Sequence, residues 1–228
     1  MPAYFNMSLE FQRKDISPTF TSDFQELLQK AGLKFQSGFW GSENNSLDEI
    51  LAWNQKHLEA NFELGFKEHY SQDYKQMLFT YDSFSYVRGF WLNNYPAKSE
   101  FTFEIIIPES EILEYYDDDR SKKEKVEFIE VEVLNAGHVH YRQQMVDVLT
   151  ASALELWQSP LVKSVQTGLE IWSGVSSAAQ IRSGKMPFVY PFAIVPDCFW
   201  EQMKDKGFRM KRVDSEGMLL MLSETEFC

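Results

Sequence analysis

The chain has 228 residues, of which 44% are hydrophobic and 15% aromatic, so residues 1–228 can form a single α+β domain with a substantial core. Its net charge of −12 would repel nucleic-acid phosphates, which disfavours nucleic-acid binding. No apolar run reaches the roughly 18 residues of a membrane span, and no secretion signal begins the chain. Two cysteines are too few for a disulfide framework. We therefore expect a soluble, cytoplasmic protein without membrane contact.

The first forty residues predict a β–α–β unit. Apolar residues alternate with other residues over 3–11, and a second strand pattern covers 33–40. Between these strands, Ser22 and Gln25 match a capping box, in which two side chains satisfy free backbone amides in the first turn of a helix. Gly32 then provides a typical helix end.

A second capping box and the strongest strand pattern follow. Ser46 and Glu49 predict the start of a helix that ends near Gly65. Apolar side chains are densest in Glu100–Pro108, which Pro108 ends because proline cannot donate to a sheet. A subdivision of the domain would fall just before this strand, near 96–100. The other elements expected in this part are a short helix over 71–76 and strands over 77–81 and 85–92.

The second half of the chain predicts one long helix among several strands. A charge-dense loop over 115–125 precedes a strand over 126–134, and an apolar stripe predicts a helix over 141–158. The remaining expected elements are strands over 165–172, 188–195, 208–213 and 218–222, and helices over 176–182 and 197–206. This pattern favours an α+β fold with a mixed or antiparallel sheet and helices packed on it.

The catalytic motifs that we tested are incomplete. Ser176 could be a nucleophile between a strand and a helix, but no histidine follows His140, so a helix N-cap is the simpler interpretation. Lys185 lacks the following Ser or Thr of a phosphate loop. His138 and His140 have no third metal ligand that the sequence places beside them, and Cys198 is more simply a buried thiol than a reactive one. We therefore assign no catalytic residue, metal ligand or cofactor.

An aromatic run over 79–95 is the most unusual compositional feature. Cross-strand aromatic pairs in an ordinary core explain it first, and a ligand cleft is the alternative. Arg88 could pair with a carboxylate or an anionic ligand. We expect Glu104 to face solvent, as the period of a strand allows; an inward Glu104 would favour a small-molecule site. The candidate ligand-binding residues are Trp40, Tyr86, Arg88, Trp91 and Glu104.

The acidic balance motivates the preferred functional hypothesis. We expect a non-enzymatic binding protein that masks or inhibits a basic protein partner. The alternatives are a small-molecule-binding protein or enzyme with an aromatic pocket, and a structural protein that forms homo-oligomers. The candidate partner-binding residues are Asp117, Asp118, Asp119, Glu127, Glu130 and Glu132.

Overall fold

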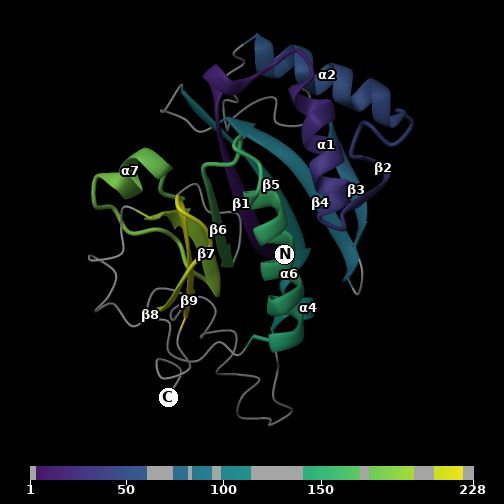
Figure 1. Ribbon diagram of the computed structural model, residues 1–228. Helices are drawn as coiled ribbons and strands as arrows, with labels where there is room; N and C mark the ends of the chain where they lie inside the picture. Colours follow the sequence, from purple (N-terminus) through teal and green to yellow (C-terminus); the bar gives the residue numbers. More distant parts are fainter. Residues whose placement is uncertain are drawn as a thin grey trace.

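A nine-stranded sheet forms the centre of the protein (Figure 1). The computed structural model describes residues 4–60, 74–81, 84–93, 99–113, 141–169, 175–197 and 208–222. Within them the strand order is β2-β3-β4-β5-β1-β6-β7-β9-β8, and every pairing between neighbouring strands is antiparallel. The strands are β1 (Tyr4–Gln12), β2 (Lys34–Phe39), β3 (Gln76–Tyr81), β4 (Phe84–Asn93), β5 (Glu100–Pro108), β6 (Ser164–Leu169), β7 (Phe192–Pro196), β8 (Phe208–Arg212) and β9 (Gly217–Leu222).

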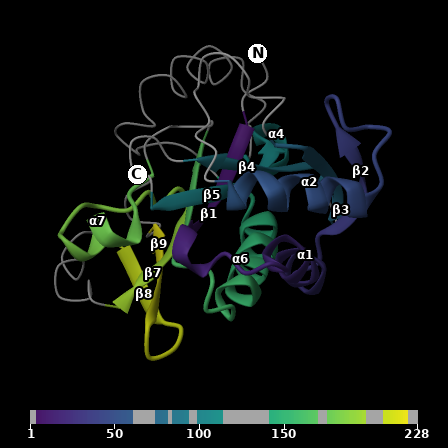
Figure 2. The same cartoon turned by 90° about the horizontal axis from the view of Figure 1, so that it is seen from above.

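Helices cover one face of this sheet, which we call the helical face. Figure 2 shows α1 and α6 together on that side, and α2 packs against α1. The helices are α1 (Phe20–Lys30), α2 (Leu47–Glu59), the short α4 (Glu109–Ile112), α6 (Gln143–Trp157) and the short α7 (Ala178–Arg182), with a 3₁₀ turn, η1 (Arg13–Asp15). None of the helices in the described ranges is long and apolar enough to cross a membrane.

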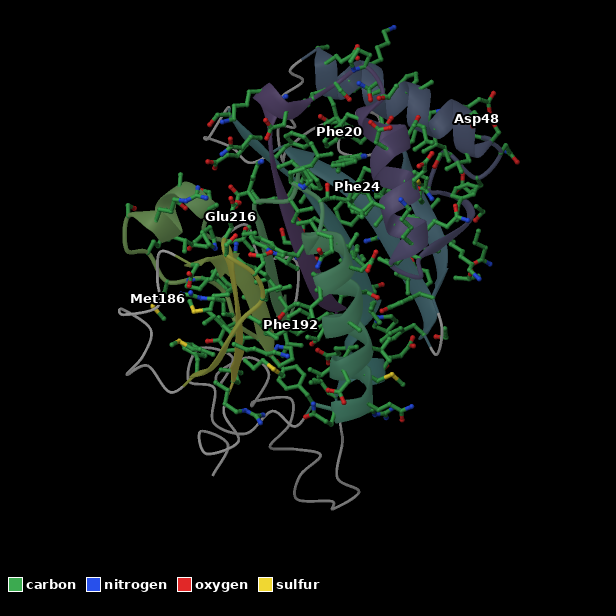
Figure 3. All side chains as sticks on the ribbon, viewed as in Figure 1. Phe20, Phe24, Asp48, Met186, Phe192 and Glu216 are labelled. Atoms are coloured by element: carbon green, nitrogen blue, oxygen red, sulfur yellow. The ribbon has the colours of Figure 1, made fainter. Side chains whose placement is uncertain are left out.

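Aromatic side chains fill the space between α1 and the central strands. Phe24 of α1 lies with its ring centre 5.0 Å from that of Phe11 on β1 and 5.0 Å from that of Phe103 on β5. Trp91 of β4 meets Phe103 at 4.8 Å, and Phe20 approaches the same group from the start of α1 (Figure 3). All five side chains are at most 2% exposed, so this cluster is the interior of the main core.

The opposite face of the sheet, which we call the polar face, is also buried along its centre. Residues Asn6, Ser8 and Glu10 of β1 alternate with the apolar residues that face the helices, yet each is at most 4% exposed. Their neighbours across the sheet are Thr102 and Glu104 on β5 and Ser164 and Gln166 on β6, which are buried as well. Farther along this face, α7 packs on β7 above a small second core of Ile181, Val189, Ala193, Val195, Met218 and Leu220.

Most elements in the described ranges agree with the sequence predictions. The strands β1 to β5, β8 and β9 and the helices α2 and α6 lie within a few residues of the expected positions. The capping box of Ser46 and Glu49 is present, with both of its hydrogen bonds. Gly32 ends α1 with a φ of 97°, which is a left-handed conformation that glycine adopts without a steric cost.

Other predictions of local structure were wrong. Helix α1 begins at Phe20 after Thr19, one turn before the predicted cap at Ser22, because Phe20 is itself a core residue. Strand β7 begins at Phe192 and not at 188, after a proline that cannot donate to the sheet. Gln76 belongs to β3 and not to a helix.

The predicted β–α–β opening is present only as a succession along the chain. Strand, helix and strand follow one another, but β3, β4 and β5 separate β1 from β2 in the sheet. Strands on both sides of residues 96–100 belong to this one sheet. Several expectations lie outside the described residues: the helix end near Gly65, the loop over 115–125, the strand over 126–134, and the helix over 197–206 except for its first residue.

Candidate functional site

A tight turn after β2 carries an exposed tryptophan. Trp40 has 55% of its surface exposed and a φ of 43°, a left-handed value that a bulky side chain rarely adopts. Gly41 follows with a φ of 80°. The Ser42 hydroxyl oxygen accepts a hydrogen bond from the Phe39 backbone N–H over 3.0 Å and lies 2.6 Å from the Phe39 carbonyl oxygen, to which it can donate. This buried hydroxyl therefore closes the turn and holds Trp40 outward.

The backbone around this turn is closely packed. A Cβ atom on Gly38 would lie 1.9 Å from the Ser42 carbonyl oxygen, so only glycine fits at that position. The Ser42 hydroxyl also lies 2.9 Å from the Gln76 carbonyl oxygen of β3, which connects the turn to the sheet. The position of Trp40 thus depends on fixed backbone contacts and not on contacts of its own ring.

Acidic side chains follow this turn in the sequence, up to the first turn of α2. Glu43, Asp48 and Glu49 are exposed, and Asp48 lies on the outer surface (Figure 3). A hydrogen bond from the Ser46 backbone N–H lowers the pKa of the Glu49 carboxyl, so this group is charged at neutral pH. We call Trp40, Glu43, Asp48 and Glu49 the Trp40 surface.

Trp53 of α2 is exposed too, but its ring already has two partners. The ring of His57 stacks on it at 4.5 Å, and the Lys75 ammonium lies 4.9 Å from its centre. The same ammonium group donates to the Asn45 side-chain oxygen over 2.6 Å. Trp53 therefore supports the surface of α2, whereas no ring contact or hydrogen bond of the Trp40 side chain occurs in the described ranges.

Arg88 on β4 lies among aromatic rings on the polar face. Its guanidinium carbon is 5.0 Å from the ring centre of Phe39, 5.3 Å from that of Phe90 and 6.0 Å from that of Tyr4. Tyr86, two residues before Arg88 on the same strand face, shares a hydrogen bond with it. Burial raises the pKa of the Tyr86 hydroxyl, and the charge of Arg88 opposes that rise.

Glu104 points inward, so the expectation that it faces solvent was wrong. It is 3% exposed and accepts hydrogen bonds from the Asn6 amide over 2.7 Å and from the Ser8 hydroxyl over 2.8 Å. Burial raises the pKa of its carboxyl, and these hydrogen bonds oppose the rise. The register of β1 against β5 places Ser8 directly beside it, so the polar face of β1 provides its partners.

Glu10 is a second buried carboxylate that the sequence analysis missed. One of its oxygens accepts from the Ser164 hydroxyl and from the Ala178 backbone N–H, each over 2.7 Å. The other, Oε1, is buried and has no hydrogen-bond partner in the described part of the chain. Burial raises its pKa from 4.5 to about 7, and the negative charge of Glu100 adds to the rise. The alternation of β1 was the available signal, because it puts Glu10 on the same face as Asn6 and Ser8.

The structure separates the five predicted ligand-binding residues into three places. Tyr86 and Arg88 lie together, and Glu104 is on the same face beside Phe90 but is enclosed by its own partners. Trp91 is on the helical face, in the core, and Trp40 is in the turn after β2. Most aromatic residues of the 79–95 run that are described are at most 7% exposed, so the core interpretation holds for them.

Surface hollows elsewhere involve different residues. One, of about 400 Å³, lies between α1 and α2 and includes Thr21, Leu51 and Gln55. Another, of about 420 Å³, lies at the outer strands and includes Gly32, Phe79 and Tyr81. Neither is lined by a predicted ligand-binding residue.

The other predicted chemistry is in part outside the described residues. Ser176 is buried, and its hydroxyl donates to the Met186 carbonyl oxygen over 2.7 Å, whereas Ser177 and not Ser176 caps α7. No group of three or more potential metal ligands occurs in the described ranges. The residues that lie outside these ranges are His138, His140, Cys198 and the whole acidic set Asp117, Asp118, Asp119, Glu127, Glu130 and Glu132.

Comparisons with known proteins identify no relative: no family model, no curated protein and no solved structure matches this chain.

Proposed function

We propose that this protein binds a basic protein partner and masks it without chemical catalysis, and that the Trp40 surface is part of its binding site. The observation that supports this proposal is the exposed Trp40 in a left-handed backbone conformation. Tryptophan is among the residues most often found as energetic centres of protein interfaces.

The backbone of Trp40 supports a binding role because its conformation is costly. A non-glycine residue in the left-handed region costs about 1–3 kcal/mol, and such residues concentrate at functional sites. The turn retains this conformation through Gly38 and Ser42. Because the backbone of Trp40 is already fixed, less conformational freedom is lost when a partner covers the indole, which favours binding.

The charge of the surrounding residues supports a basic partner. The carboxylates of Glu43, Asp48 and Glu49 are exposed around the turn, and the whole chain has a net charge of −12. A Lys or Arg side chain of the partner can lie over the Trp40 ring and pair with these carboxylates. Electrostatic attraction of this kind accelerates association and weakens with salt.

The test compares proteins that bind to the immobilised chain and to two variants. Trp40→Ala removes the proposed anchor, and Met186→Ala removes an apolar residue that is 41% exposed at the other end of the sheet. Lysate of the organism that encodes the chain is applied at about 50 mM and 200 mM salt, and bound proteins are quantified by mass spectrometry. We expect a basic protein that the wild type and Met186→Ala retain and that Trp40→Ala retains at least about tenfold less.

The proposal is then tested with the purified partner. Titration calorimetry should give a 1:1 complex whose affinity falls as salt rises and falls further in the charge-reversal variant Glu43→Lys. If Trp40→Ala retains the same proteins as the wild type, or if the protein that it loses is acidic, the proposed site is wrong.

A further inference from the structure

We propose that Arg88 and the rings around it form a binding site for a small organic acid, with the guanidinium pairing the carboxylate and the rings contacting its apolar body. This site is on the polar face of the sheet and does not depend on the proposed basic partner. Tyr4, Phe39 and Tyr86, which are half-buried, provide the rings, and the guanidinium also lies 5.3 Å from the ring centre of the buried Phe90.

Arg88 lacks a charged partner in the described ranges. Arg88 is half-buried on β4 between Leu78 of β3 and Ile106 of β5, so its strand neighbours offer no charge. No ion pair of Arg88 occurs in the part of the chain that the structure describes. By contrast, Lys163, which is also half-buried, pairs with Asp15 at 2.9 Å.

That Arg88 has no counterion among the described residues is unusual, because acids exceed bases by 34 to 22 in the whole sequence. Glu104 is on the same face one strand away, but Asn6 and Ser8 already occupy its two oxygens. The Nε–H of Arg88 is buried and has no acceptor among the described residues. A buried donor without an acceptor has a free-energy cost that an added carboxylate can remove.

The geometry of the rings favours a carboxylate over other anions. A guanidinium group presents parallel N–H donors that match the two oxygens of a carboxylate. Aromatic rings at 5.0 to 6.0 Å from the guanidinium exclude water from one side of the charge and strengthen the pairing. They also offer apolar surface to an aromatic or aliphatic body, which inorganic phosphate lacks.

Benzoate is the probe for this site. Its addition to the ¹⁵N-labelled wild-type chain should give saturable shifts in the amide signals of β4 and the neighbouring turn. Arg88→Gln should weaken this binding about tenfold or more, because it removes the charged donor pair. Arg209→Gln, on the exposed edge strand β8, is the matched control and should bind benzoate like the wild type.

Two further ligands and one further variant define the chemistry that the site recognises. Acetate should bind through the same amides but more weakly than benzoate, and benzylammonium should not bind. Arg88→Lys keeps the charge but loses the paired donors, so it should also bind benzoate more weakly. If Arg88→Gln does not fold, Arg88→Lys takes its place in the test. Thermal unfolding of each variant shows whether the fold is retained.

Specific results would overturn the proposed benzoate site. Equal benzoate affinity in the wild type and in both Arg88 variants would overturn the proposal, and so would phosphate binding as tight as benzoate binding. Retention of benzoate by Trp40→Ala would show that this site is distinct from the Trp40 surface, so the two proposals can fail independently.

Discussion

The buried carboxyl of Glu10 predicts an unusual dependence of stability on pH. Its pKa rises from 4.5 to about 7 on folding, mainly because burial disfavours the charged form. Between these two values the folded chain keeps a proton on Glu10 that the unfolded chain has released. Stability therefore falls as pH rises through this window, which is opposite to the behaviour of a carboxylate in a salt bridge.

The magnitude follows from the difference in pKa. A shift from 4.5 to about 7 corresponds to about 3 kcal/mol between the acid and neutral ends of the window. The sequence pI of 4.8 reduces solubility at the acid end, so the measurement begins at pH 5.5. From pH 5.5 to 8 the expected change is about 2 kcal/mol.

Glu10→Gln isolates this effect, because glutamine has nearly the same shape and cannot lose a proton near neutral pH. We expect the free energy of unfolding of Glu10→Gln, relative to wild type, to rise by about 2 kcal/mol from pH 5.5 to 8. Urea unfolding followed by tryptophan fluorescence measures it. The exposed Glu26→Gln is the control and should show no such rise. A pH-independent difference between Glu10→Gln and wild type would refute the argument.

Two further predictions concern the outer part of the sheet. Gly38→Ala places its methyl group 1.9 Å from the Ser42 carbonyl oxygen, so thermal unfolding should show a loss of stability of at least about 1–3 kcal/mol. The methyl group of Gly41→Ala would meet no atom within 4 Å, so this control should lose only about 1 kcal/mol. Asn54 is fully buried and exchanges hydrogen bonds of 2.8 and 2.9 Å with the Lys75 backbone. Asn54→Ala should cost about 2–4 kcal/mol by urea unfolding, because it leaves both Lys75 groups unpaired, whereas the exposed Asn44→Ala should be nearly neutral; equal losses at the two asparagines would contradict this.

Local patterns predicted the elements that depend on local interactions. The strand Glu100–Pro108 matches β5 at both ends, and the Ser46 capping box predicted the start of α2, because each signal lies within a few residues of its effect. The start of α1 was misplaced because burial of Phe20 against Phe11, a tertiary contact, extends the helix past the local cap signal at Ser22.

The polar face could not be predicted from the same patterns. The alternation of side chains indicates that Glu104 and Glu10 point to the face of the sheet opposite the apolar face, but it cannot show that this second face is buried as well. Their partners come from elsewhere in the chain: Ser8 for Glu104, and Ser164 and Ala178 for Glu10. The strand order, the register and the packing of α7 bring these groups together. Arg88 was identified, since it stood alone in the aromatic run, but two of its rings, Phe39 and Tyr4, come from other strands.

The position of β1 at the middle of the sheet has a consequence for synthesis on the ribosome. Its two partner strands begin at Glu100 and Ser164, so β1 leaves the ribosome long before either exists. At typical elongation rates of about 5–20 residues per second, the interval before β6 emerges is on the order of ten seconds. During that time β1, which has apolar side chains such as Phe5 and Leu9, has no native strand to pair with. Unpaired strands of this kind favour chaperone binding and intermolecular strand pairing. The nascent chain therefore passes through an aggregation-prone stage before the strands on both sides of β1 can pair with it.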